Sequence, residues 1–116
     1  MIKRLSSRPK GYFKEAHNED NFIWFALYYK KEIYAYIAIE MLGLFASIHT
    51  EIIKWNHNIV KVLRIDWEEL KFICKRHGVK EVVASNNDVE DKRWPKFIKM
   101  YGFPKPEPIL VSRQEI

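Results

Sequence analysis

The middle of the chain passes from a strand-like pattern of hydrophobic and polar positions to a helix-like one. Between Leu44 and Ile53 apolar and polar side chains alternate, which is typical of a strand. One face carries Leu44, Ala46, Ile48 and Ile52, and the other carries Ser47, His49 and Glu51. After the polar segment Lys54–Asn58, apolar side chains recur at helical spacing at Ile59, Leu63, Trp67, Leu70, Ile73, Cys74 and His77. We therefore predict a strand that leads directly into the longest helix, which ends at Gly78.

Two further strands are predicted ahead of this unit. Phe22–Tyr29 is β-branched and aromatic throughout, which is typical of a strand covered on both sides. A tight turn at Lys30–Glu32 leads to a second strand, Ile33–Met41, and Leu42-Gly43 turns again. The second strand has Ile33, Ile37, Ile39 and Met41 on one face and Tyr34, Tyr36 and Glu40 on the other. Together with Leu44–Ile53 these strands are expected to form an antiparallel meander.

The residues after the long helix predict the rest of a mixed sheet. Val79–Asn87 has the pattern of a buried strand, and a strand–helix–strand unit normally runs parallel and right-handed. Asp88–Met100 has an acidic start and an apolar stripe, which predict a short helix, and Ile109–Ile116 predicts a last strand. Residues 1–21 are polar and offer at most a short strand or helical turn, anchored by Tyr12-Phe13. We expect one α+β domain over residues 1–116, with 1–21 a truncated or mobile N-terminal segment.

Composition supports a compact domain and narrows its location. A chain of 116 residues with 47% hydrophobic side chains can bury a core without the help of disulfides or bound metals. No apolar run approaches the roughly 18 residues of a membrane span, and Met1-Ile2-Lys3-Arg4 does not lead into a signal-peptide core. We expect a cytoplasmic protein. The single cysteine, Cys74, cannot form an internal disulfide and is predicted to be a buried bystander.

The charge pattern does not favour nucleic acid as a partner. Net charge is +5, from 20 Lys and Arg against 15 Asp and Glu, and the basic residues are spread along the chain. They occur without a helix–turn–helix, zinc-finger or RNP pattern. Acidic partners are thus only weakly indicated.

The candidate chemistry lies on the polar face of the predicted strand and at the start of the long helix. His49 and Glu51 have two interpretations, a general base poised near neutrality or a pair of polar side chains facing solvent. His57 and Asn58 either cap the helix or contact a phosphate through it. The histidines have no HExxH or CxxC companion, so no metal site is predicted.

A family resemblance follows from the element order and from two short matches. Three strands, a long helix, a strand, a short helix and a last strand, with Asn86-Asn87 and Gly102-Phe103 in place, resemble the GNAT acetyltransferase superfamily. More narrowly, His49-Thr50-Glu51-Ile52, Asp66-Trp67 and Trp94–Lys99 are similar to the small GNAT-like proteins encoded by tailed bacteriophages.

The resemblance implies an acetyl-CoA site at the same strand and helix. It implies that pantetheine lies along Glu51–Ile53, that pyrophosphate sits at Trp55–Val60, and that His49 or Glu51 is the catalytic base. The cofactor-binding residues implied in this way are Ile52, Ile53, Asn56, His57, Asn58, Ile59 and Asn87.

The sequence also departs from the family it resembles. No glycine occurs between Gly43 and Gly78, although the family has a glycine-rich phosphate loop there. Ile98 stands where the family has a proton-donating tyrosine, and the 21 residues before Phe22 are too few for the family's first strand and two helices.

These departures favour one function while leaving two alternatives open. The favoured hypothesis is a phage-type GNAT-like protein with a degenerate acetyl-CoA site, which binds a host or virion protein in the host cytoplasm or in the virion. The first alternative is an active acetyl-CoA-dependent N-acetyltransferase with a His or Glu base on the central strand. The second is a homodimer formed through a sheet edge left bare by the missing first strand.

Overall fold

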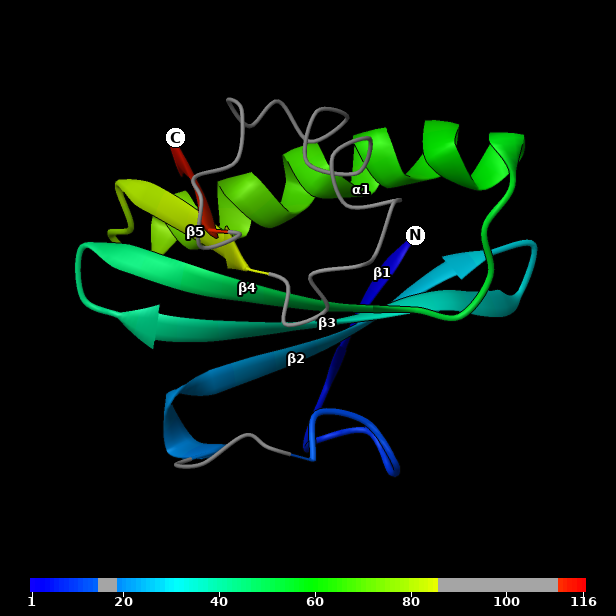
Figure 1. The fold of residues 1–116 in the computed structure, drawn as a ribbon, viewed down its shortest axis with the longest axis horizontal. Helices are drawn as coiled ribbons and strands as arrows, with labels where there is room; N and C mark the ends of the chain where they lie inside the picture. Colours follow the sequence, from blue (N-terminus) through cyan, green and yellow to red (C-terminus); the bar gives the residue numbers. More distant parts are fainter. Residues whose placement is uncertain (15–18, 86–110) are drawn as a thin grey trace.

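The computed structural model describes residues 1–14, 19–85 and 111–116. Its strands form one six-stranded sheet in the order β1-β2-β3-β4-β5-β6 (Figure 1). The strands are β1 (Ile2–Leu5), β2 (Phe22–Tyr29), β3 (Glu32–Leu42), β4 (Phe45–Ile52), β5 (Glu81–Ser85) and β6 (Val111–Glu115), and the 3-10 turn η1 (Glu19–Asn21) precedes β2. Only β4 and β5 pair in parallel, and the other neighbours are antiparallel. The predicted α+β class, the meander and the parallel crossover are confirmed.

The hairpin between β2 and β3 is closed by Lys30 and Lys31, both with positive φ (49° and 67°). Two consecutive left-handed residues match the right-handed twist of the flanking strands. Register then shifts, because Leu27 pairs with Ala35 whereas Tyr28 pairs with Ile33. The extra residue on β3 is Tyr34, which therefore turns to the other face of the sheet.

The prediction that Tyr34 shares a face with Tyr36 is wrong for this reason. Tyr34 is buried, and its hydroxyl donates a hydrogen bond to Asp66 Oδ2 at 2.5 Å. The amino group of Met1 lies 3.1 Å from Asp66 Oδ1. These two donors satisfy a carboxylate that is 2% exposed and would otherwise be costly to bury.

Helix α1 (His57–Arg76) crosses one face of the sheet (Figure 1). Its predicted apolar stripe is confirmed at Ile59, Leu63, Trp67, Leu70 and Cys74, which are all buried. Burial raises the pKa of the Cys74 thiol to about 11, so this cysteine is a packing residue and not a nucleophile. His77 is exposed, contrary to the prediction, because the helix ends at Arg76 and Gly78 adopts φ +84°.

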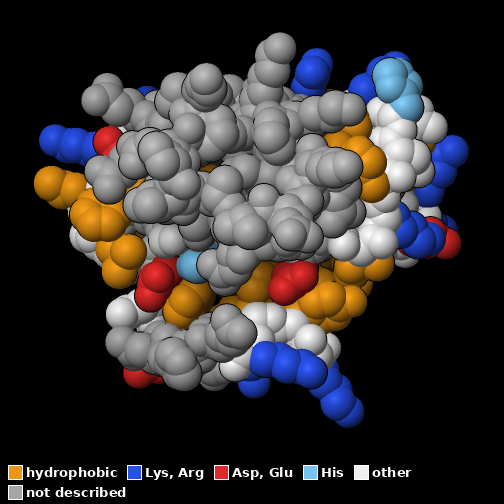
Figure 2. Space-filling view, in the orientation of Figure 1, with side chains coloured by type: hydrophobic (Ala, Val, Ile, Leu, Met, Phe, Trp, Pro, Cys, Tyr) orange, Lys and Arg blue, Asp and Glu red, His pale blue; other side chains and the backbone are white. Residues whose placement is uncertain are grey.

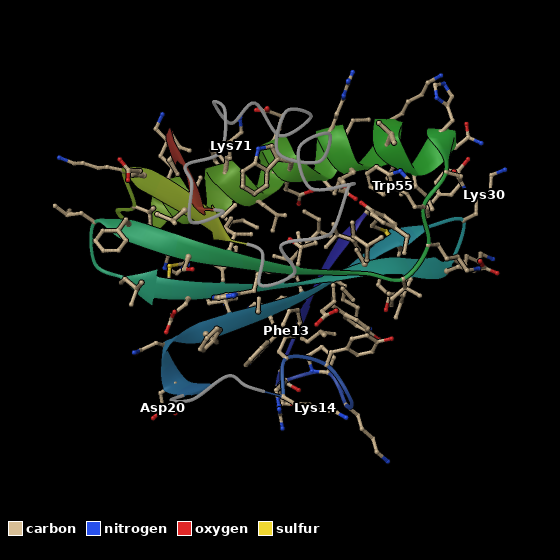
Figure 3. All side chains as sticks on the ribbon, in the orientation of Figure 1. Phe13, Lys14, Asp20, Lys30, Trp55 and Lys71 are labelled. Atoms are coloured by element: carbon tan, nitrogen blue, oxygen red, sulfur yellow. The ribbon has the colours of Figure 1, made fainter. Side chains whose placement is uncertain are left out.

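The opposite face of the sheet is covered in part by the N-terminal segment. The ring of Tyr12 lies 4.7 Å from that of Tyr36, and the ring of Phe13 lies 5.7 Å from that of Trp24. Figure 3 shows Phe13 between this segment and the strands. The predicted anchoring by Tyr12-Phe13 is thus confirmed.

Strand β1 corrects a second expectation. It pairs with β2 from Ile2↔Leu27 to Leu5↔Trp24, so the edge of β2 is covered and a first strand is present. The edge of β2 that was expected to be bare is therefore covered, and the described sheet ends at β1 instead. Leu44 lies in the β3–β4 turn and not in β4.

The expected Asn86-Asn87, the short helix at 88–100 and the start of the last strand at 109–110 lie outside the described residues. In the described part of the chain, no helix is long and apolar enough to cross a membrane.

Candidate active site

The parallel strands β4 and β5 run together for only part of the length of β4. Their pairing begins at Phe45↔Glu81 and stops at Ile48↔Ala84. Beyond that point β4 continues from His49 to Ile52, still paired with β3 on its other side. Among the residues that the structure describes, this stretch of β4 therefore has no strand on its β5 side. An edge of this kind offers backbone N–H and C=O groups to an extended ligand.

Four residues separate the end of β4 at Ile52 from the start of α1 at His57, and a cap holds this start of the helix. Asn56 has extended backbone angles, and its Oδ1 accepts a hydrogen bond from the Ile59 N–H at 3.0 Å. The Val60 N–H donates to the Asn56 carbonyl at 3.1 Å. Within the described residues, the N–H groups of His57 and Asn58 have no acceptor. The first turn also has no acidic residue, so the positive end of the helix is available to an anion.

The loop between β4 and α1 is fixed without glycine. The Tyr34 carbonyl accepts hydrogen bonds from the N–H groups of Ile53 (2.8 Å) and Lys54 (3.1 Å). Lys54 also pairs with Glu32, and this hydrogen bond and charge lower the pKa of the Glu32 carboxyl. No residue between Gly43 and Gly78 has a positive φ, so the path of this loop does not require glycine. The absence of glycine is therefore compatible with the observed path of the loop.

His49 faces away from α1, on the polar side of β4. Its Nε2 lies 3.3 Å from Ser47 Oγ and 3.9 Å from Glu40 Oε1, and its ring lies 5.9 Å from that of Phe22. Burial lowers the pKa of His49 below 6.5, and the Glu40 carboxylate partly opposes this effect. The imidazole is therefore neutral at pH 7. The direction of the hydrogen bond between Nε2 and Ser47 Oγ depends on the tautomer of the imidazole. We assign the proton to Nε2 because this nitrogen faces the Glu40 carboxylate, which leaves Nδ1 as the basic nitrogen.

The structure places the predicted site residues on β4, in the loop that follows it and at the start of α1. His49 and Glu51 share one face of β4, and Glu51 is exposed opposite Tyr36. His57, Asn58 and Asn56 are exposed at the helix start, where Asn56 already acts as the cap. The side chain of Ile59 is buried and its N–H is bonded to Asn56, whereas Ile52 packs against the core and presents only its backbone to the edge. Ile53 is exposed beyond the strand, and Asn87 lies outside the described residues.

Glu40 is a site residue that the sequence reasoning did not connect with His49. It belongs to β3 and pairs with Ser47, two positions before His49 on β4. The turn at Gly43 fixes this register, so counting outward from the turn could have brought the two side chains together.

Comparison with known proteins gives structural matches alone. No protein-family model and no curated protein sequence matches the chain. The N-acetyltransferase PaiA of Thermoplasma acidophilum, solved in complex with coenzyme A, matches with a TM-score of 0.65 and 12% identity, over 83% of this chain and 62% of that protein. The ribosomal-protein-S5-alanine acetyltransferase of Vibrio fischeri matches with a TM-score of 0.59 and 7% identity, over 87% and 65%. A GNAT-family acetyltransferase of Streptococcus pneumoniae matches with a TM-score of 0.58 and 11% identity, over 85% and 70%.

The chain has the GNAT acetyltransferase fold. At such low identities the similarity shows the fold alone, and the chain spans less than two thirds of the length of the first two of these proteins. Among the described residues of this fold, two features bear on ligand binding: the stretch of β4 beyond its pairing with β5, and the first turn of α1 with its unbonded N–H groups.

Proposed function

We propose that this chain binds acetyl-CoA at the edge of β4 and transfers the acetyl group to an amine, with His49 as the base. The observation that carries this proposal is the end of β4–β5 pairing at Ile48↔Ala84, one residue before His49. Within the described residues, one stretch of chain thus holds a strand edge without a partner on its β5 side, a neutral imidazole and the start of a helix.

The residues present fit a cofactor of this shape. The edge from His49 to Ile52 can pair with the amide groups of a pantetheine arm, as an added strand would. The N–H groups of His57 and Asn58 suit a pyrophosphate, since both the free donors and the helix dipole favour negative charge. When bound, acetyl-CoA supplies a thioester whose carbonyl carbon reacts with an amine nitrogen.

His49 has the environment of a base that works near neutral pH. An attacking amine must lose a proton, which Nδ1 of the neutral imidazole can accept. In the tautomer with the proton on Nε2, Ser47 Oγ accepts from Nε2–H, and the Glu40 carboxylate stabilises the imidazolium once Nδ1 is protonated. Glu51 lies two residues away on the same face and is the alternative base.

The proposal is tested by acetyl-CoA binding and by acetyl transfer to a panel of amines. We expect a saturable rise in melting temperature with acetyl-CoA, because a ligand that binds only the folded state stabilises it. His49→Gln should keep that rise and lose transfer, and added imidazole should restore part of the rate. No rise in melting temperature at millimolar acetyl-CoA would rule the proposal out.

A second candidate is a non-catalytic, phage-encoded GNAT-like protein that binds a host or virion protein. One observation favours it beyond the missing loop glycines and Ile98. Leu42, Leu44 and Phe45 at the β3–β4 hairpin are 41%, 64% and 46% exposed. Figure 2 shows hydrophobic side chains gathered at the end of the molecule where this hairpin lies. Exposed apolar side chains that form a contiguous patch often mark an interaction surface, whereas single exposed apolar residues are common on any protein.

The two candidates differ in the residues on which they depend. Under the binding hypothesis, Leu44→Asp with Phe45→Asp should abolish capture of a protein partner, while His49→Ala with Glu51→Ala should leave capture unchanged. Under the transferase proposal, the hairpin variant should keep acetyl transfer. Loss of partner capture in the His49/Glu51 variant, with folding intact, would contradict the binding hypothesis.

A further inference from the structure

A cavity of about 450 Å³ lies between β1, β2 and the C-terminal part of α1. Its volume falls in the range of small-molecule sites, which is roughly 300–1,000 Å³. The candidate active site lies elsewhere, at the N-terminal end of α1 and along the last residues of β4. No residue of that site lines the cavity.

The cavity has an apolar floor and a charged rim. The floor consists of Ile2, Phe25 and Ile73, which all belong to or pack against the hydrophobic core. The rim carries Arg4 from β1 and Arg76 and His77 from the end of α1. Three separate elements thus bring cationic groups and apolar side chains to one hollow.

Within residues 1–14, 19–85 and 111–116, no ion pair neutralises the charges of the rim. Among the described residues, neither Arg4 nor Arg76 forms an ion pair, and Arg76 only lies over the Phe72 ring at 5.9 Å from its centroid. Glu69 is the single acidic residue of the lining, and it too has no ion pair there. The helix C-terminus adds about half a negative charge. The two guanidinium charges exceed the sum of these negative charges, so the described lining carries a net positive charge.

From this arrangement we infer that the cavity is a binding site for a small organic anion, with a carboxylate or phosphate group on an apolar body. The planar guanidinium groups of Arg4 and Arg76 present paired donors that match such an oxyanion. The floor of Ile2, Phe25 and Ile73 covers the apolar body. A free inorganic ion would leave this floor exposed, and a neutral apolar molecule would leave the rim charges unmatched.

The inference is tested by titrating the protein with phenyl phosphate and, separately, with benzoate. Binding is followed by NMR through the His77 imidazole and the Ile2 and Ile73 methyl groups, with the His57 imidazole reporting on the start of α1. We expect the cavity resonances to shift with a Kd of about 1 mM, as befits a ligand of this size. Inorganic phosphate has the anionic group without the apolar body, and phenol has the apolar ring without the anionic group. Each should bind at least about tenfold more weakly than phenyl phosphate. A shift with only one of the two probes would tell phosphate from carboxylate ligands.

Variants decide whether the rim carries the binding. Arg4→Gln with Arg76→Gln should raise the Kd at least about tenfold, because it removes both charged donors. Arg64→Gln is the matched control, since Arg64 is exposed on α1 outside the cavity and should leave the Kd unchanged. Three results would each overturn the inference: no shift with either probe, shifts confined to His57, or equal affinity in the double variant and the control.

Discussion

The two faces of β4 show how one strand serves both the fold and the candidate chemistry. Ala46 and Ile48 point toward α1 and are buried in the apolar core. Ser47, His49 and Glu51 point to the other face, where His49 lies near Glu40 and the ring of Phe22. Figure 2 shows histidine, acidic and hydrophobic side chains close together in the lower half of the view. Because a slip of one residue would exchange the faces, the buried side chains also fix the direction of His49.

The largest loss of stability is expected when a buried side chain is removed from the face of α1 that packs on the sheet. Trp67 is buried on the face of α1 that covers the sheet, and Trp67→Ala should lower the free energy of unfolding by about 3–5 kcal/mol. Ile65 is 71% exposed on the same helix, so Ile65→Ala should cost less than about 0.5 kcal/mol. Urea denaturation measures both, and similar losses in the two variants would contradict the assignment of the two sides.

A substitution on the polar face of β4 should instead lower activity and leave stability nearly unchanged. His49→Gln is expected to lower kcat/KM for acetyl transfer by about 10²–10⁴-fold, the usual contribution of a general base. The free energy of unfolding should change little, because the side chain is about a third exposed. A variant with unchanged kcat/KM would transfer the role of base to Glu51 or to solvent.

The cap of α1 separates folding from anion binding. Asn56→Ala should lower the free energy of unfolding by about 1 kcal/mol, through loss of the hydrogen bond to the Ile59 N–H. Asn56→Asp can still cap the helix, yet its negative charge should weaken acetyl-CoA binding at the neighbouring N–H groups. Denaturation and acetyl-CoA titration of the two variants measure these effects. Equal acetyl-CoA affinity in Asn56→Asp and the parent would place the phosphates elsewhere.

The smallest expected effect concerns the pH dependence of His49. Glu40→Gln removes the charge that opposes the effect of burial, so the pKa of His49 should fall further below 6.5. NMR titration of the imidazole should show this fall, and the acidic limb of the kcat/KM profile should move to lower pH. An unchanged pKa in Glu40→Gln would show that the carboxylate does not act on the ring.

The lowered pKa of His49 also sets the sign of its effect on stability. Because folding favours the neutral imidazole, the contribution is fully present above the unfolded value of 6.5. It is lost as the pH falls through the lower pKa of the folded protein. We expect the free energy of unfolding to fall more steeply in the parent than in His49→Gln as the pH is lowered from 8 to 5. Denaturation across this pH range measures the difference.

Much of this arrangement could be predicted from hydrophobic periodicity. The alternation in β4 placed His49 and Glu51 on the polar face, and the helical spacing identified Leu63, Trp67 and Leu70 as core residues. These elements are buried on a defined side, so their period is visible in the sequence.

Features that depend on a single irregularity or on register could not be predicted in the same way. The β-bulge at Tyr34 adds one residue to β3, and a tyrosine with a buried Asp66 partner is not recognisable as a core residue from its period. Strand β1 is a short edge strand in which Lys3 and Arg4 are exposed, so it carries no continuous apolar signal. The approach of Glu40 to His49 requires the register of the β3–β4 pair, which periodicity alone does not give.

We propose that acetyl-CoA binds along β4 beyond its pairing with β5, and one measurement tests this proposal most directly. In a titration of ¹⁵N-labelled protein with acetyl-CoA, we expect the backbone amides of His49–Ile53 and of Asn56–Val60 to shift together and to saturate. The amides of β1, at the far edge of the sheet, should stay in place. Absence of shifts at millimolar acetyl-CoA, or shifts that leave both segments unchanged, would contradict the account.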